Sequence, residues 1–180
     1  FPSARIIATE KHFPANGDAL VDSHVAIPRI EKDFAELWEN DLLPFRHLVR
    51  EGIPAVMGGH LSFPNITKDG EPSTISPFFQ TEILRDRLGF QGIAITDDLL
   101  MSGVTNTGLP IEEIARRAVE AGNDIILVSR NSTIHSIVWE YLLKKMREDP
   151  AFNSRVREAA KRVLQTKCTY LRGEKAVPIV

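Results

Sequence analysis

The segment from Lys11 to His24, KHFPANGDALVDSH, gathers side chains that can bind a polar ligand or move a proton. Its histidines and aspartates are interrupted by Pro14 and Gly17, which is the composition of a loop rather than of a core. Asp22 and His24 stand two residues apart, so in an extended loop they can point the same way. The Asp22 carboxylate would then favour a protonated His24, a candidate general acid and base. On a surface loop an aspartate and a histidine this close are more often only solvated. A catalytic role for Asp22 and His24 therefore needs further evidence from the rest of the sequence.

A second candidate pair, Asp97-Asp98, follows the apolar run at residues 92–96. A carboxylate there can act as a nucleophile, and the alternative is a structural or helix-capping pair. Lys11 and His12 have two readings as well, either as hydrogen-bonding partners of a polyhydroxylated ligand or as a solvated loop start.

The remaining histidines lack such neighbours. His60 follows the Gly58-Gly59 pair, and we expect a hydrogen-bonded supporting histidine there. His47 and His135 fall in helical stretches and are expected at the surface.

Four short apolar runs, at residues 4–9, 53–57, 92–96 and 124–128, alternate with amphipathic helical patterns. This order predicts an α/β fold of parallel βα units with polar groups at the strand ends, as in a (β/α)8 barrel. A full barrel takes eight strands and about 250 residues. The sequence therefore predicts half a TIM barrel, either part of a longer chain that begins mid-barrel or a half completed by another chain.

The amino-acid composition excludes several classes of protein. The 180 residues are 43% hydrophobic, enough for one domain with a core. Lys and Arg number 22 and Asp and Glu 24, so no basic field indicates nucleic acid or an anionic membrane. The single Cys168 excludes an intrachain disulfide, and we expect it on a helix. No apolar run reaches the roughly 20 residues of a membrane span. We expect a cytoplasmic protein, or a secreted protein or lipoprotein if a presequence has been removed.

Two longer motifs together resemble one family. KHFPANGDALVDSH is similar to K-H-F-P-G-H/N-G, followed after four further residues by D-S/T-H, in family 3 glycoside hydrolases of the bacterial β-N-acetylglucosaminidase (β-hexosaminidase) type. GFQGIAITDDLLM resembles their segment ending in S/T-D-x-L-x-M, and LLPFRHLVREGIPAVMGGH resembles the helix and strand between them. The resemblance runs from Arg5 to about Asn131 and is specific, because two long motifs occur in the right order. It implies the C-terminal half of the family's catalytic barrel.

Residue roles follow from the resemblance. It implies that Asp97 is the nucleophile, because this aspartate follows a threonine where the family's follows serine or threonine. His24 becomes the general acid and base on a mobile loop, with Asp22 as its partner. Lys11 and His12 become contacts to the N-acetylglucosamine ring.

The loop departs from the family pattern at two places. Ala15 stands where the family usually has glycine, and Asn16 stands where histidine is commoner. Neither change removes a catalytic group, so both bear on the motion of the loop.

The implied activity is a retaining exo-β-N-acetylglucosaminidase that removes terminal N-acetylglucosamine from peptidoglycan fragments, without a cofactor or metal. Because histidine would replace one carboxylate of the usual pair, phosphate could replace water as acceptor, so a phosphorylase is an alternative. Another alternative is a metal-dependent barrel hydrolase built on His12, His24, His60 and Asp97, although no histidine pair with ligand spacing supports it.

A third alternative comes from another class of protein, an inactive fragment or a half-barrel assembly module that lacks the upstream half. We expect residues 1–172 to form the C-terminal half of the barrel domain and residues 173–180 an irregular tail. The expected partners are a carbohydrate substrate and the missing N-terminal half or another chain that completes the barrel.

Overall fold

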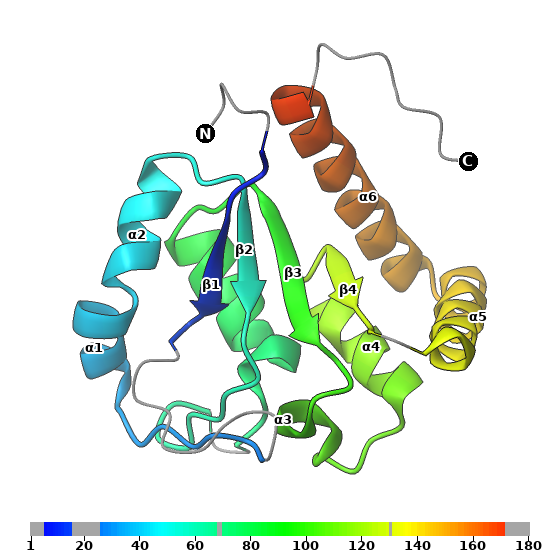
Figure 1. Ribbon diagram of the computed structural model, residues 1–180, viewed down its shortest axis with the longest axis horizontal. Coiled ribbons are helices and arrows are strands. Elements are labelled where there is room, and N and C mark those ends of the chain that lie inside the picture. Colours follow the sequence, from blue (N-terminus) through cyan, green and yellow to red (C-terminus); the bar gives the residue numbers. More distant parts are fainter. Residues whose placement is uncertain (1–5, 16–25, 68–69, 130, 172–180) are drawn as a thin grey trace.

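Four parallel strands form the central sheet of the computed structural model, which describes residues 6–15, 26–67, 70–129 and 131–171. The strands lie side by side in chain order (Figure 1). Their bounds are Thr9–Phe13 for β1, Ala55–Gly58 for β2, Ile93–Asp98 for β3 and Ile125–Leu127 for β4. Every neighbouring pair is parallel, so all four carboxyl ends meet at one edge of the sheet. The predicted series of parallel βα units is confirmed.

The predicted position of the first strand is wrong. Instead of residues 4–9, the strand covers Thr9–Phe13, and Lys11 belongs to it rather than to the following loop. Thr9 pairs with Ala55 and Lys11 with Met57. Polar residues are tolerated here because β1 is the outermost strand among the described residues, so that Lys11 remains exposed.

The third strand is longer than predicted at its carboxyl end. It includes Asp97 and Asp98, because Asp98 pairs with Leu127 of β4 after an irregularity in the register. Both aspartates therefore sit on a strand whose hydrogen bonds hold it, which fixes their backbone more firmly than a loop would.

Helices connect the strands, and most follow the sequence pattern. Pro44 occupies the first turn of α2, and Gly122, at φ 129°, ends α4 as predicted. The expected loop at residues 102–109 instead contains a short helix, α3. The helical bounds are α1 Phe34–Glu36, η2 Leu37–Asp41, α2 Leu43–Arg50, η3 Ser73–Ile75, η4 Phe78–Arg87, α3 Ser102–Thr105, α4 Ile111–Ala121, α5 Ser132–Glu148 and α6 Pro150–Leu171.

One face of the sheet packs against helices and the other does not. Val56 of β2 and Ala94 of β3 belong to the same buried cluster as Phe79 and Ile83 of η4. Met57 and Ile95, a register pair, alternate with Val56 and Ala94 and so point to the opposite face, where both are only half-buried. Figure 1 shows no helix across that face among the described residues.

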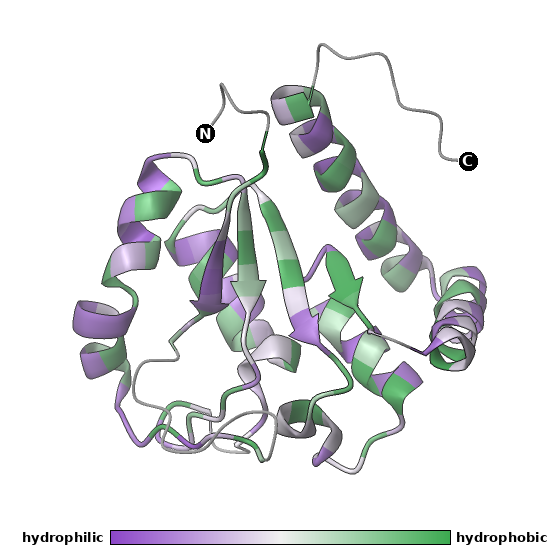
Figure 2. Cartoon of the chain, in the orientation of Figure 1, coloured by the Kyte–Doolittle hydropathy of each residue, from purple (hydrophilic) through white to green (hydrophobic). Residues whose placement is uncertain are grey.

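Hydropathy changes along the strands. Figure 2 shows β3 hydrophobic over most of its length and hydrophilic at its arrowhead, while β1 is hydrophilic along much of its length. Polar side chains therefore lie along β1 and at the carboxyl end of β3. Among the described residues, no helix has the length and apolar character that crossing a membrane requires.

Candidate active site

A histidine and an aspartate meet at the carboxyl edge of the sheet. His12 of β1 places Nε2 3.3 Å from Oδ2 of Asp97 on β3, with the two side chains 22% and 20% exposed. Both were predicted from the sequence as site residues, and the structure brings them together. Their partial exposure leaves the pair accessible to a ligand.

A glycine directly after β2 makes this contact possible. Neighbouring strands are about 4.8 Å apart, so β1 and β3 are separated by about 10 Å with β2 between them. A Cβ atom at Gly59 would lie only 3.1 Å from the Cβ of His12. A Cβ at Gly58 would lie 2.9 Å from Nε2 of Gln80. Because Gly59 has no side chain, His12 can lie against the backbone just after β2 and reach Asp97.

Asp97 has one carboxylate oxygen fixed and one facing the histidine. Its Oδ1 accepts a hydrogen bond from the backbone N–H of Asp98 at 2.8 Å. Its Oδ2 is the atom that faces His12. This geometry suits a carboxylate that must present one oxygen to a reacting centre.

Asp98 is built into the framework. Its Oδ1 accepts from the backbone N–H groups of Leu100 and Ser129, each at 3.1 Å, and its Oδ2 accepts from the Ser129 hydroxyl. Burial raises the pKa of Asp98, but the hydrogen bonds from Ser129 and Leu100 outweigh it, and the net pKa lies below its usual value. The aspartate pair thus divides into an accessible carboxylate, Asp97, and a structural one, Asp98.

The electrostatic setting of His12 favours the neutral ring. Burial lowers its pKa below the usual 6.5, and the charge of Lys11 lowers it further, while Asp97 acts in the opposite direction. A neutral imidazole with a proton on Nε2 can donate toward the carboxylate. Lys11, next to His12, is exposed at the outer edge of the sheet.

The other two predicted catalytic residues, Asp22 and His24, lie outside the described residues. Their roles therefore stay predictions from the sequence. The structure fixes the chain directly before them, since Phe13 and Ala15 are buried in the core.

His60 is a buried, hydrogen-bonded histidine, as expected. It is 1% exposed, and both ring nitrogens have partners, Thr74 and the backbone carbonyl of Asp98. The part of the chain that the structure describes holds no group of three or more histidine, cysteine, aspartate or glutamate side chains able to bind a metal ion. His47 and His135 are exposed, as predicted, and Cys168 lies on a helix, α6, as predicted.

Sequence reasoning missed several supporting residues. Ser129 follows β4 in a polar strand end, which is a usable signal, because strand ends converge in this fold. Thr74 lies in a turn-rich connection and carried no signal. The glycine pair before His60 was visible in the sequence, but the contact of Gly59 with His12 depends on strand order.

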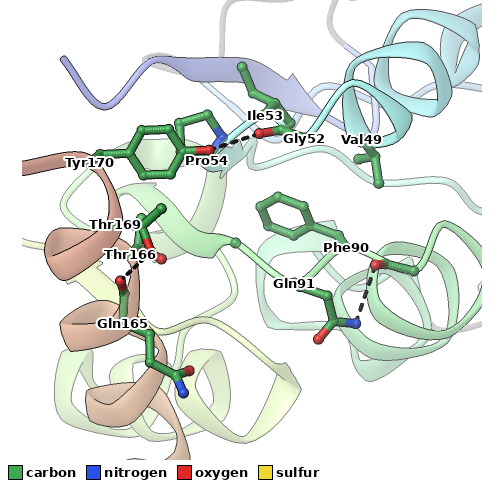
Figure 3. Close-up of a pocket in the computed structure, with 12 residues that line it drawn as sticks. Val49, Gly52, Ile53, Pro54, Phe90, Gln91, Gln165, Thr166, Thr169 and Tyr170 are labelled. Carbon is green, nitrogen blue, oxygen red and sulfur yellow. Dashed lines mark hydrogen bonds between the residues drawn. The ribbon is translucent and has the colours of Figure 1, made fainter. Parts of the chain in front are cut away.

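A cavity of about 360 Å³ lies at the other end of the sheet (Figure 3). Its lining includes Pro54 and Gly92, which precede β2 and β3, together with residues near the end of α6. The Tyr170 hydroxyl donates to the Gly52 carbonyl at 3.1 Å across its rim. Because Asp97 is at the carboxyl end of β3, this cavity is separate from the candidate active site.

Comparison with protein families gives one assignment for most of the chain. Residues 2–166 match the glycosyl hydrolase family 3 N-terminal domain. The chain is 42% identical over 118 residues to a β-hexosaminidase of Aromatoleum aromaticum, covering 66% of this chain and 32% of that protein. It is 40% identical over 121 residues to a β-hexosaminidase of Methylobacillus flagellatus, covering 67% of this chain and 34% of that protein.

A solved structure supports the same fold. The chain matches a glycoside hydrolase family 3 β-N-acetylglucosaminidase from Paenibacillus sp. str. FPU-7 with a TM-score of 0.91 and 32% identity. The match covers 100% of this chain and 34% of that one. The chain therefore spans about a third of the length of these relatives, and its four parallel βα units correspond to half of a TIM-type barrel.

Proposed function

The chain belongs to glycosyl hydrolase family 3, and from this premise we propose that it carries the nucleophile half of a retaining exo-β-N-acetylglucosaminidase. The proposed substrate is a glycan with a terminal N-acetylglucosamine, such as a peptidoglycan fragment. The rest of the sugar site would come from the other half of the barrel, supplied by further sequence or by another chain.

The proposed reaction has two steps. Asp97 attacks the anomeric carbon while His24 protonates the leaving oxygen, which forms a glycosyl-enzyme and releases the aglycone. His24 then takes a proton from water, which attacks the anomeric carbon and frees the carboxylate. Asp22 would orient His24 and stabilise its protonated ring. Lys11 and His12 would hold the sugar in place.

The contact between His12 and Asp97 carries the proposal. It brings a neutral hydrogen-bond donor from β1 within 3.3 Å of an accessible carboxylate on β3. The structural role of Asp98 strengthens the assignment, because only Asp97 of the pair has an oxygen left to face a ligand. Two residues of the family motifs thus share one small region of the barrel mouth.

The test uses the full-length gene product and para-nitrophenyl N-acetyl-β-glucosaminide. We expect release of nitrophenol and of N-acetylglucosamine in the β configuration first, observed by proton NMR. Asp97→Asn should lower kcat by at least about a thousandfold, because it removes the nucleophile. The matched control His47→Gln, at an exposed position on α2, should leave kcat unchanged.

Three further arms separate the alternatives. Parallel assays in phosphate and in a non-nucleophilic buffer distinguish hydrolysis from phosphorolysis, since only a phosphorylase releases a sugar phosphate. Activity that survives a chelator excludes the metal-dependent reading. The isolated 180-residue chain should be far less active than the full-length gene product. Failure of the full-length gene product to hydrolyse the substrate would contradict the proposed function.

A further inference from the structure

His60 lies behind the His12 and Asp97 pair and takes no part in the proposed chemistry. It follows Gly59 at the end of β2 and is 1% exposed. The charges of Asp97, Asp98 and His12 all act on its ring. The two hydrogen bonds of the His60 ring show what this buried histidine holds in place.

The first hydrogen bond defines where the ring proton lies. Nε2 of His60 is 3.0 Å from the backbone carbonyl oxygen of Asp98. A carbonyl oxygen only accepts, so Nε2 must carry the proton and donate. The other ring nitrogen, Nδ1, lies 2.8 Å from the Thr74 hydroxyl oxygen. Burial lowers the pKa of His60, although the Asp98 hydrogen bond and the nearby carboxylates oppose this.

The second hydrogen bond ties the ring to the loop after β2. Thr74 is fully buried, and its hydroxyl donates to the Gly59 carbonyl at 2.6 Å. Ser73 donates to that same carbonyl at 2.8 Å. The single hydroxyl proton of Thr74 goes to Gly59, so the Thr74 oxygen faces Nδ1 of His60 as an acceptor. The ring is therefore held from the side opposite to Asp98.

Asp98 in turn holds Asp97. Its carbonyl accepts from His60 and from the backbone N–H of Met101 at 3.0 Å, while its own N–H donates to Oδ1 of Asp97. The path from His60 to the carboxylate thus contains one backbone residue and no flexible side chain.

We infer that His60 is a positioning residue, which orients the Asp97 carboxylate by fixing the Asp98 backbone from the end of β2. This inference rests on the proposed function, because orientation of Asp97 matters for attack on a sugar. A carboxylate displaced by about 1 Å is a poor nucleophile, and such misplacement costs up to about a hundredfold in rate. The loss falls on kcat rather than on KM, because the attack geometry is needed only in the transition state.

Kinetics of three variants test the inference. His60→Leu should lower kcat on the nitrophenyl glycoside about tenfold to a hundredfold with KM within about twofold. His60→Gln keeps an N–H donor and an acceptor, so it should recover a substantial part of kcat. The control His47→Leu, which removes an exposed ring, should match the wild type. A His60→Leu protein with wild-type kcat would overturn the inference and leave the proposed function standing.

A measurement on the unaltered chain gives an independent test. In protein with ¹⁵N-labelled histidine, the ring signals absent from His60→Gln belong to His60. We expect a proton on Nε2 at pH 7. A proton on Nδ1 alone would overturn the inference, because Nε2 could not then donate to Asp98. A wild-type gene product without hydrolysis would overturn both the proposed function and this role.

Discussion

Two neighbouring aspartates of β3 have different roles because their hydrogen-bond partners differ. Asp98 accepts hydrogen bonds on both carboxylate oxygens from Ser129 and Leu100, so it links the carboxyl end of β3 to the residues after β4. Asp97 receives only the Asp98 N–H on one oxygen and turns the other toward His12. The residue types alone offer both carboxylates equally. The family motif singles out Asp97, and the hydrogen bonds that engage Asp98 agree with that choice.

Replacing His24 tests the acid at the residue scale. His24→Ala in the full-length gene product should lower kcat/KM strongly on a disaccharide, whose leaving group needs protonation, by about 10²- to 10⁴-fold. The loss should be much smaller on para-nitrophenyl N-acetyl-β-glucosaminide, because nitrophenolate leaves without help. Equal losses on the two substrates would contradict the role of His24 as the acid.

The family motif identified the site residues but not the hydrogen-bond partners that hold them. Lys11, His12 and Asp97 were recognised from sequence, and the structure places His12 against Asp97. The support from Thr74 was not predictable, because it depends on a contact between segments fourteen residues apart that no local periodicity encodes. Side-chain types can be read from a chain, but hydrogen-bond partners across strands require the register.

At the scale of elements, the strand ends carry the site and one buried histidine links stability to pH. His60 has a pKa below the usual 6.5 because it is buried, so the unfolded chain binds a proton at higher pH than the folded chain. Its stabilising contribution is complete above pH 6.5 and is lost as the pH falls through the folded-state pKa. His12, whose pKa is also lowered by burial, acts in the same direction.

We therefore predict that replacing His60 changes how steeply the melting temperature depends on pH. Between pH 7 and pH 5 the melting temperature of the wild type should fall, and in His60→Gln the fall should be smaller. Scanning calorimetry at several pH values measures this, with His47→Gln as the control that keeps the wild-type slope. A His60→Gln profile parallel to that of the wild type would show that His60 does not titrate differently in the folded state.

A second inter-element feature lies at the opposite end of the strands. Asp124, just before β4, has a fully buried carboxylate that pairs with Arg85 of η4 at 2.6 Å and with Arg155 and Arg162 of α6 at 3.0 and 2.7 Å. Burial lowers the pKa of Arg85 to about 10, although Asp124 acts against this. One carboxylate thus fastens η4 and α6 to the sheet.

Removing that charge should be costly. Asp124→Asn leaves three guanidinium groups without their central anion, and we expect a loss of about 3 to 5 kcal/mol in the free energy of unfolding. Urea titration followed by circular dichroism measures it. The control Glu148→Gln breaks only exposed pairs with Lys144 and Lys145 and should change stability by less than about 1 kcal/mol. Equal effects of the two substitutions would refute the fastening role.

Element prediction succeeded where one local pattern governs and failed where distant pairing decides. Pro44 and Gly122 marked α2 and α4 correctly, because capping is local. The first strand was placed too early, because its apolar residues were counted while the pairing of Thr9 with Ala55 could not be seen. The hydrophobic pattern was tested against the 3.6-residue period of an α-helix, so it could not indicate the wider π-helical turns of η4.

At the scale of the whole molecule, the chain is half of a barrel with one covered and one open face. Met57 and Ile95 on the open face are half-buried, whereas Val56 and Ala94 on the covered face are buried. Counting strands was sufficient to predict this half-barrel, because three apolar runs coincide with β2, β3 and β4 and the first overlaps the start of β1. We propose that residues 1–172 belong to this domain and that the complementary half closes the barrel over Asp97.

The most direct test of the central claim is to find where the sugar becomes attached. A fluorinated N-acetylglucosaminide with a good leaving group slows release of the glycosyl-enzyme enough for mass spectrometry of the full-length gene product. The account predicts a mass gain of one sugar residue, located on the peptide that contains Asp97 and absent from Asp97→Asn. Attachment to any other residue, or hydrolysis by the Asp97→Asn protein at the wild-type rate, would contradict it.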